Sequence, residues 1–163
     1  MEKKRKNRKA LPIIGLVRFD EYAGARAWDE TRVLTLMDPG FGLPPNEYAF
    51  VEFYCADPSC DCRRVILQVW SKDTPGKALA TISYGWEDEA FYTDWNYGDA
   101  QMGREMKGPV LELLQPQSNL ADKLLHQFKK TIMSDKAYLK RLETHYAFAK
   151  EKQAVKPRKK RKQ

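Results

Sequence analysis

Alternating apolar and polar positions in the middle of the chain predict a group of neighbouring strands. Residues 48–55 alternate well between two faces, and residues 64–71 and 77–84 are two further runs typical of strands. One face of the first run carries Tyr48, Phe50, Glu52 and Tyr54, and the other carries Ala49, Val51, Phe53 and Cys55. Residues 73–76, Asp-Thr-Pro-Gly, form a turn signal, because proline fixes φ at the second position and glycine accepts a positive φ at the third. We therefore expect an antiparallel three-strand meander over residues 48–84.

Three more segments resemble strands, and one aromatic segment has a different pattern. Residues 13–19, 31–37 and 110–114 are short apolar runs bounded by polar or turn-forming residues. Residues 86–98 mix five aromatic side chains with four carboxylates. We interpret this segment as a lid whose rings pack on the sheet, with an aromatic binding platform or an acidic metal site as the alternatives.

The last third of the chain has a helical period. Ser118 is a good N-cap, and a stripe follows it at four-residue spacing: Leu120, Leu124, Phe128 and Ile132. A second stripe consists of Tyr138, Leu142, His145 and Ala149. The sequence thus predicts an α+β fold, in which an antiparallel sheet of about five strands is covered by a C-terminal pair of amphipathic helices.

Charge divides the chain into a body and two basic ends. The total is +7, but residues 1–9 carry +5 and residues 156–163 carry +6, which leaves −4 for the remainder. We therefore predict a basic disordered arm at 1–9, a single globular domain at 10–152 and a basic disordered tail at 153–163. The basic residues at 3–9 and 156–162 are expected to contact nucleic acid or another polyanion without sequence readout.

The compartment follows from the absence of targeting signals. The apolar run at 10–17 follows basic residues as in a secretory signal, but it is short and Pro12 interrupts it. No stretch approaches the ~20 apolar residues that span a bilayer. We expect a cytoplasmic protein whose thiols stay reduced, so that clustered cysteines indicate metal binding or reactivity before disulfides.

The chemically distinctive segment is the cysteine hairpin at residues 55–62. Asp57-Pro58 forms a turn that returns Cys60 and Cys62 opposite Cys55, and the two-residue spacing places the later pair on one side of an extended chain. Three convergent thiolates supply three of the four ligands of tetrahedral zinc.

The fourth ligand has several candidates. His145 lies on the inward helical stripe, whereas His126 has polar neighbours one turn away on both sides, so His145 is the preferred ligand. Asp57, Asp61, a water or a ligand from a second chain are the alternatives. Against the preferred assignment, a histidine on an apolar stripe is commonly a hydrogen-bonded core residue.

The same cysteines also allow other chemistry. They can be buried structural thiols, or one can be a redox-active or nucleophilic thiolate activated by Arg63, Arg64 or His145. A metallo-hydrolase would need an open metal position and a base such as Glu52 or Asp57. The two arginines can instead offset the excess negative charge of a three-thiolate zinc site.

The segments Phe50-Val-Glu-Phe-Tyr-Cys55, Asp57-Pro58 and Cys60-Asp-Cys62-Arg-Arg64, together with His145-Tyr146, resemble a pattern found in uncharacterised prokaryotic proteins. The resemblance covers the central third and the last helix, and it implies no activity. The resulting hypothesis is an accessory or interaction protein with a structural zinc site, and a cysteine-based redox or hydrolytic enzyme is the alternative.

Overall fold

The meander predicted over residues 48–84 forms the centre of the sheet. In the computed structural model, which describes residues 15–39 and 42–155, β3 (Asn46–Cys55), β4 (Arg64–Ser71) and β5 (Ala80–Gly85) are paired antiparallel in that order. The predicted turn joins β4 to β5, with Gly76 at φ 81°. The backbone N–H of Lys77 closes this turn by donating to the carbonyl of Thr74 at 3.2 Å.

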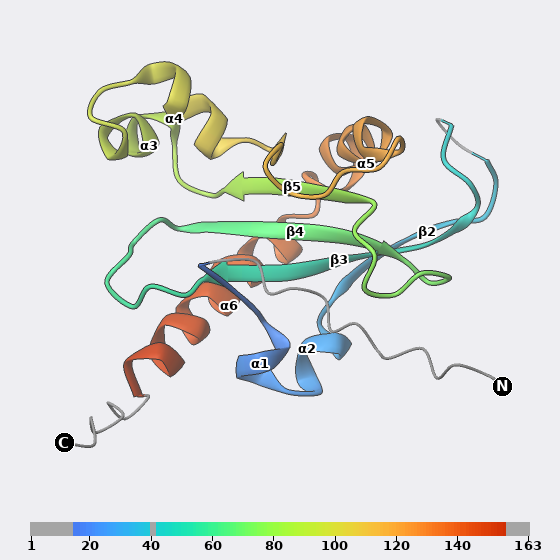
Figure 1. Ribbon diagram of the computed structural model, residues 1–163, viewed down its shortest axis with the longest axis horizontal. Helices are drawn as coiled ribbons and strands as arrows, with labels where there is room; N and C mark the ends of the chain where they lie inside the picture. Colours follow the sequence, from blue (N-terminus) through green and yellow to red (C-terminus); the bar gives the residue numbers. More distant parts are fainter. Residues whose placement is uncertain (1–14, 40–41, 156–163) are drawn as a thin grey trace, which may run out of the picture.

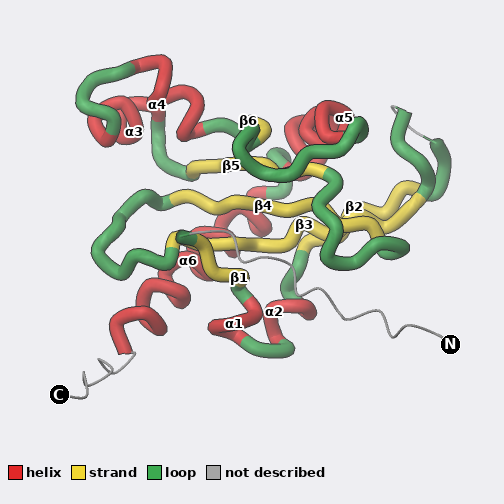
Figure 2. The backbone as a smooth tube through the Cα atoms, viewed as in Figure 1, coloured by secondary structure: helices red, strands yellow, loops and turns green. Residues whose placement is uncertain are grey.

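Three short strands complete an antiparallel sheet of six. β1 (Leu16–Arg18) and β2 (Arg32–Leu36) both pair with β3, β1 near the end of β3 and β2 near its start. β6 (Val110–Leu111) extends the opposite edge beside β5, as Figure 2 shows. The prediction of an α+β protein with an antiparallel sheet is confirmed, with six strands where about five were expected.

The C-terminal helices cover one face of this sheet. α5 (Ala121–Gln127) continues into a π-helical turn, η1 (Phe128–Ile132), and the long α6 (Lys136–Val155) crosses behind the strands (Figure 1). The main core forms between the two layers: Leu124, Phe128, Ile132, Tyr138 and Leu142 of the predicted stripes are buried in it, and Leu120 packs against it partly exposed. From β3, Tyr48, Phe50 and Tyr54 point into this core.

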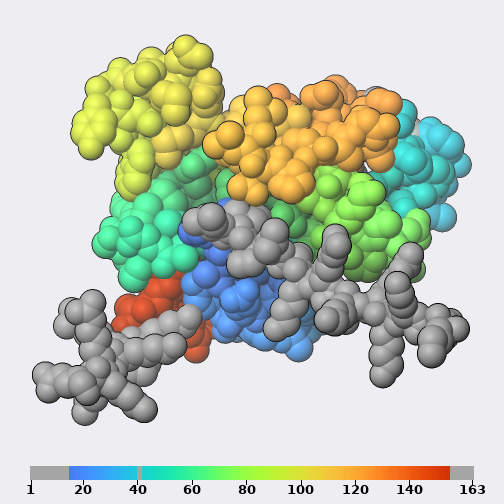
Figure 3. All heavy atoms as spheres, viewed as in Figure 1, coloured from blue at the N-terminus to red at the C-terminus, as the bar shows by residue number. Residues whose placement is uncertain are grey.

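Four helices occupy segments where the sequence analysis predicted none. α1 (Asp20–Ala23) and α2 (Arg26–Asp29) lie in the polar stretch between β1 and β2. The aromatic segment forms α3 (Glu89–Trp95), and α4 (Ala100–Lys107) follows it. Figure 3 shows these two helices as a separate lobe (yellow) at one corner of the visible face.

The aromatic rings of residues 86–98, the segment interpreted above as a lid, divide between buried and exposed positions. Tyr92 is fully buried, and Trp86 packs edge-on against Tyr146 of α6 at 5.1 Å between ring centroids. Tyr97, by contrast, is fully exposed, and Trp95 is 40% exposed. Two of the aromatic rings therefore anchor the lobe, while Trp95 and Tyr97 reach its surface.

The folded part of the chain extends slightly beyond the predicted C-terminal limit of the globular domain at residue 152. α6 continues through Gln153, a buried residue that the sequence analysis assigned to the basic tail. The basic arm at 1–9 and the charged residues 156–162 lie outside the described residues. Within the described ranges, no helix is long and apolar enough to span a membrane.

Candidate metal centre

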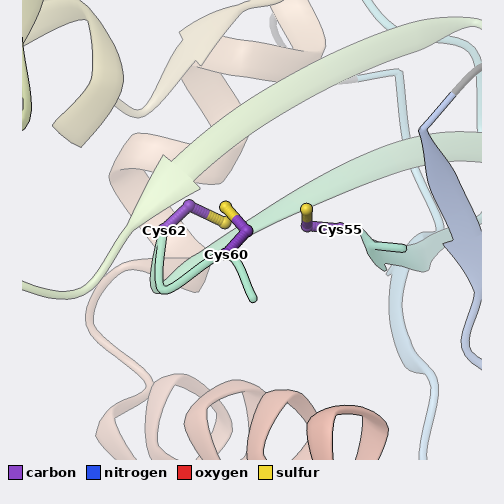
Figure 4. A group of neighbouring side chains, drawn as sticks. All are labelled: Cys55, Cys60 and Cys62. Carbon is purple, nitrogen blue, oxygen red and sulfur yellow. The ribbon is translucent and has the colours of Figure 1, made fainter. Parts of the chain in front are cut away.

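The three cysteines converge at the tip of the hairpin between β3 and β4. Their sulfur atoms all lie within 4.8 Å of one another, and Figure 4 shows Cys60 and Cys62 pointing toward each other beside Cys55 at the strand end. Zinc–sulfur bonds of about 2.3 Å in a tetrahedron place two sulfurs about 3.8 Å apart. A single ion can therefore engage all three sulfurs after small side-chain adjustments.

The local turn that brings the cysteines together is the predicted one. The Asp57 carboxylate accepts hydrogen bonds from the backbone N–H and the hydroxyl of Ser59, at 2.9 and 2.7 Å. The N–H of Cys60 donates to the Asp57 carbonyl at 3.1 Å, which closes the turn. Arg63 then adopts φ 49°, in the left-handed region, and this bend starts β4 at the next residue.

One face of helix α6 holds the hairpin by hydrogen bonds to its backbone carbonyls. Lys150 Nζ donates to the carbonyl of Asp57 at 2.7 Å, and Gln153 Nε2 donates to that of Cys55 at 2.7 Å. Tyr146, one turn before Lys150, bonds through its hydroxyl to the carbonyl of Cys60 at 3.4 Å. These residues have the i, i+4, i+7 spacing of one helical face. These three side chains of α6 thus hold the hairpin through its backbone carbonyls and not through the sulfurs.

Burial and mutual proximity shift the thiols of Cys60 and Cys62 toward their protonated form. Desolvation, followed by the neighbouring Cys62 and Cys55, raises the pKa of Cys60 to about 12. Desolvation and Cys55 also raise the pKa of Cys62, although the hydrogen bond with Cys60 and the neighbouring Arg64 oppose this shift. Neither thiol has the lowered pKa of a nucleophilic cysteine, whereas a bound cation would stabilise the thiolates together.

The structure does not bring His145 to the cysteines. Its Nδ1 lies 2.6 Å from Oε1 of Glu52, and its Nε2 lies 2.6 Å from Oε2 of Glu30. The ring also stacks on Phe19, with centroids 4.1 Å apart. Both nitrogens are therefore engaged by carboxylates in and beside the core, as the core-histidine interpretation anticipated. Glu52, considered above as a hydrolytic base, is 3% exposed in this same network.

The other predicted participants are also held by nearby groups. Asp61 forms a bidentate ion pair with Arg63, with N···O distances of 2.9 and 3.1 Å. Arg63 reaches Glu87 at 3.5 Å as well, and its guanidinium lies over the ring of Phe91. Arg64 donates to the carbonyl of Met106 at 3.0 Å and to the hydroxyl of Ser83. Of the two arginines, Arg64 is the one that acts electrostatically on Cys62.

A pocket opens directly beside the cysteine cluster. Its volume is about 400 Å³, and all three cysteines line it. Phe53 and Ile66 belong to its apolar lining, and they form a small cluster with Val51 on the sheet face opposite the main core. Trp95 and Met106 from the α3–α4 lobe also line it, together with Arg64, Glu112 and Gln115. This pocket was not predicted, because it depends on where the lobe packs.

Comparison with protein-family models, with curated proteins and with solved structures gave no match. What the cysteine cluster can bind therefore follows from its own chemistry.

Proposed function

We propose that this protein binds one zinc ion through Cys55, Cys60 and Cys62, and that the ion stabilises the hairpin tip of an accessory or interaction protein. The convergence of the three sulfurs within 4.8 Å is the observation that carries the proposal. Three thiolates from one short loop form a soft ligand set, which favours zinc over magnesium or calcium. A reduced cluster of this kind also suits the cytoplasm.

The enzyme alternative has less support. A thiolate nucleophile needs a pKa near or below neutral pH, but the pKa values of Cys60 and Cys62 are shifted upward. The suggested hydrolytic base, Glu52, is buried and already accepts hydrogen bonds from Tyr54 and His145. A metal held mainly for structure requires neither group to react.

Chelation under native conditions tests the structural role of the ion. Purified protein should contain about one zinc per chain, and removal of zinc by a strong chelator should lower its melting temperature. The triple variant Cys55→Ser, Cys60→Ser, Cys62→Ser is the matched control, and its melting temperature should not respond to chelator. Equal melting curves for the wild-type protein with and without chelator would contradict the proposal.

Contact with a polyanion is a second, separate proposal, supported by the charge of the two chain ends. Residues 1–9 and 156–163 together carry +11, while the rest of the chain carries −4. Binding to single-stranded RNA should weaken steeply with salt, because contacts between basic residues and phosphates release counterions. Removal of both ends should abolish this binding and leave the zinc content unchanged.

A further inference from the structure

The candidate zinc site has one ligand position that no described side chain fills. No fourth histidine, cysteine, aspartate or glutamate of the described residues joins the three sulfurs. Outside the described residues, only Glu2 carries a side chain of these four types. Tetrahedral zinc with three protein ligands keeps its fourth position for water or another ligand, as in catalytic sites.

A ligand can reach the cysteine cluster through the pocket that the three cysteines line. Because all three cysteines line the same pocket of about 400 Å³, an ion on their sulfurs borders that space. The volume lies in the range of small-molecule sites, and most of the lining is apolar. Trp95 and Phe53 supply aromatic walls.

Charge restricts the donor group of a ligand in this position. Zinc with three thiolates has one negative charge in excess. Arg64 and Glu112 both line the pocket and cancel each other, so an anionic donor such as a carboxylate would meet a net negative site. A neutral nitrogen donor adds no charge, and three cysteines with one imidazole are a common zinc ligand set.

Glu112 gives such a ligand a second contact. The backbone of Glu112 is fixed beside β5, because its N–H donates to the carbonyl of Thr81 at 2.9 Å and its carbonyl accepts from Gln117 at 2.9 Å. A metal-bound imidazole commonly donates its other N–H to a carboxylate. Glu112 is the carboxylate that lines this pocket.

We propose that the pocket beside Cys55, Cys60 and Cys62 binds a small molecule whose neutral aromatic nitrogen, of the imidazole type, completes the coordination of the metal while its apolar body packs against Trp95 and Phe53. This inference rests on the proposed zinc site, and it adds the ligand class that the site accepts.

Cobalt-substituted protein tests the proposal, because Co²⁺ enters zinc sites and, unlike zinc, has visible absorption that reports its ligands. The probes are imidazole, 4-phenylimidazole and 2-phenylpyrrole, titrated at about pH 8, where imidazole is neutral. The first two should change the cobalt spectrum saturably, and 4-phenylimidazole should bind about tenfold more tightly because its phenyl ring buries apolar surface. 2-Phenylpyrrole lacks a basic nitrogen and should leave the spectrum unchanged.

Two tryptophan variants provide a matched comparison. Trp95 lines the pocket at 40% exposure, and Trp28 lies elsewhere at 44% exposure. Trp95→Ala should remove most of the preference for 4-phenylimidazole over imidazole, whereas Trp28→Ala should keep it. Equal preference in both variants would overturn the assigned pocket.

The remaining outcomes separate the two proposals. Cobalt uptake with a spectrum that neither imidazole changes would overturn the ligand inference and leave the metal site standing. A spectrum that changes on Glu112→Ala before any ligand is added would show that Glu112 itself coordinates the metal, which also overturns the inference. Failure to take up cobalt or zinc would overturn both proposals.

Native mass spectrometry should find a monomer with one metal and one 4-phenylimidazole, and a dimer linked through the metal would contradict the small-molecule assignment.

Discussion

Nδ1 of His145 lies 2.6 Å from Oε1 of Glu52, and this buried pair joins the last helix, α6, to β3 of the sheet. The Tyr54 hydroxyl donates to the same carboxylate oxygen, and Nε2 of His145 faces Glu30. A carboxylate buried this deeply needs its donors, because loss of one partner leaves an uncompensated charge in the core. His145 therefore has a structural role in the core, and it does not belong to the group formed by the three cysteine sulfurs.

The first prediction separates this role from metal binding. His145→Ala should lower the free energy of unfolding by about 3–5 kcal/mol, the usual cost of removing one partner from a buried charged pair. Zinc content per folded chain should stay the same. As a control, Lys129→Ala changes an exposed side chain and should alter stability by no more than about 0.5 kcal/mol. Loss of zinc on His145→Ala in protein that remains folded would restore this histidine as a ligand.

The second prediction concerns the contacts between α6 and the hairpin. Lys150→Ala and Gln153→Ala each remove a hydrogen bond to a backbone carbonyl in the cysteine loop. Each should weaken zinc binding by about tenfold or more, since groups that position metal ligands contribute on this scale. Lys140 is a suitable control because it pairs with Glu143 on the same helix. Competition with a chromophoric chelator measures the zinc affinity of Lys150→Ala, Gln153→Ala and the control Lys140→Ala. Equal affinities in the three variants would show that α6 does not position the site.

The third prediction follows from the raised thiol pKa values. In metal-free protein, Cys60 and Cys62 should react with iodoacetamide near neutral pH more slowly than an unstructured cysteine peptide, because little of each is thiolate. Their rates should increase as the pH rises through 9 toward about 12 for Cys60. Peptide mass spectrometry resolves the individual residues. Rapid labelling of one of these two at pH 7 would instead support the thiol-enzyme alternative.

The fourth prediction is a pH dependence at the start of α6. The backbone N–H of Tyr138 and the nearby Arg32 lower the pKa of Asp135. Because the folded-state pKa is lowered, ionised Asp135 stabilises the fold above its unfolded pKa of about 3.9, and this contribution is lost as the pH falls through the folded value. Asp135→Asn keeps a capping side chain and removes the charge.

Thermal melts of the wild-type protein and Asp135→Asn at a series of pH values test this sign. The wild-type protein should melt at the higher temperature near neutral pH, and the difference should narrow below about pH 4. A difference that stays constant down to about pH 2 would show that the charge of Asp135 does not contribute.

Local patterns accounted for the strands and the two C-terminal helices. The alternation of side chains along β3 placed Tyr48, Phe50 and Tyr54 on the core face, and the four-residue spacing of Leu124, Phe128 and Ile132 did the same for the helices. These patterns predict structure because the residues that face a large core are apolar and recur at the period of a strand or of a helix.

The short helices had weaker signals, which were present in the sequence. The side chains of Asp88 and Asp99 cap α3 and α4 by accepting from the N–H three residues later. Aspartate is a preferred N-cap residue, so these two positions indicate where α3 and α4 begin.

Long-range packing explains why part of the site was not predicted. The hairpin turn and the convergence of the cysteines are local, so their spacing was informative. The inward position of Glu52 on β3 also offered a partner for His145, since a buried carboxylate and a buried histidine in one core tend to pair. By contrast, Trp95 and Glu112 reach the pocket only through the packing of distant segments, which no local period records.

Metal content per chain, measured by elemental mass spectrometry on protein purified under reducing conditions, tests the central claim most directly. The wild-type protein should contain about one zinc per chain, and Cys60→Ser should lose it while circular dichroism shows that the variant retains its secondary structure. The absence of metal from the wild-type protein, or equal zinc in both proteins, would contradict a zinc site formed by Cys55, Cys60 and Cys62.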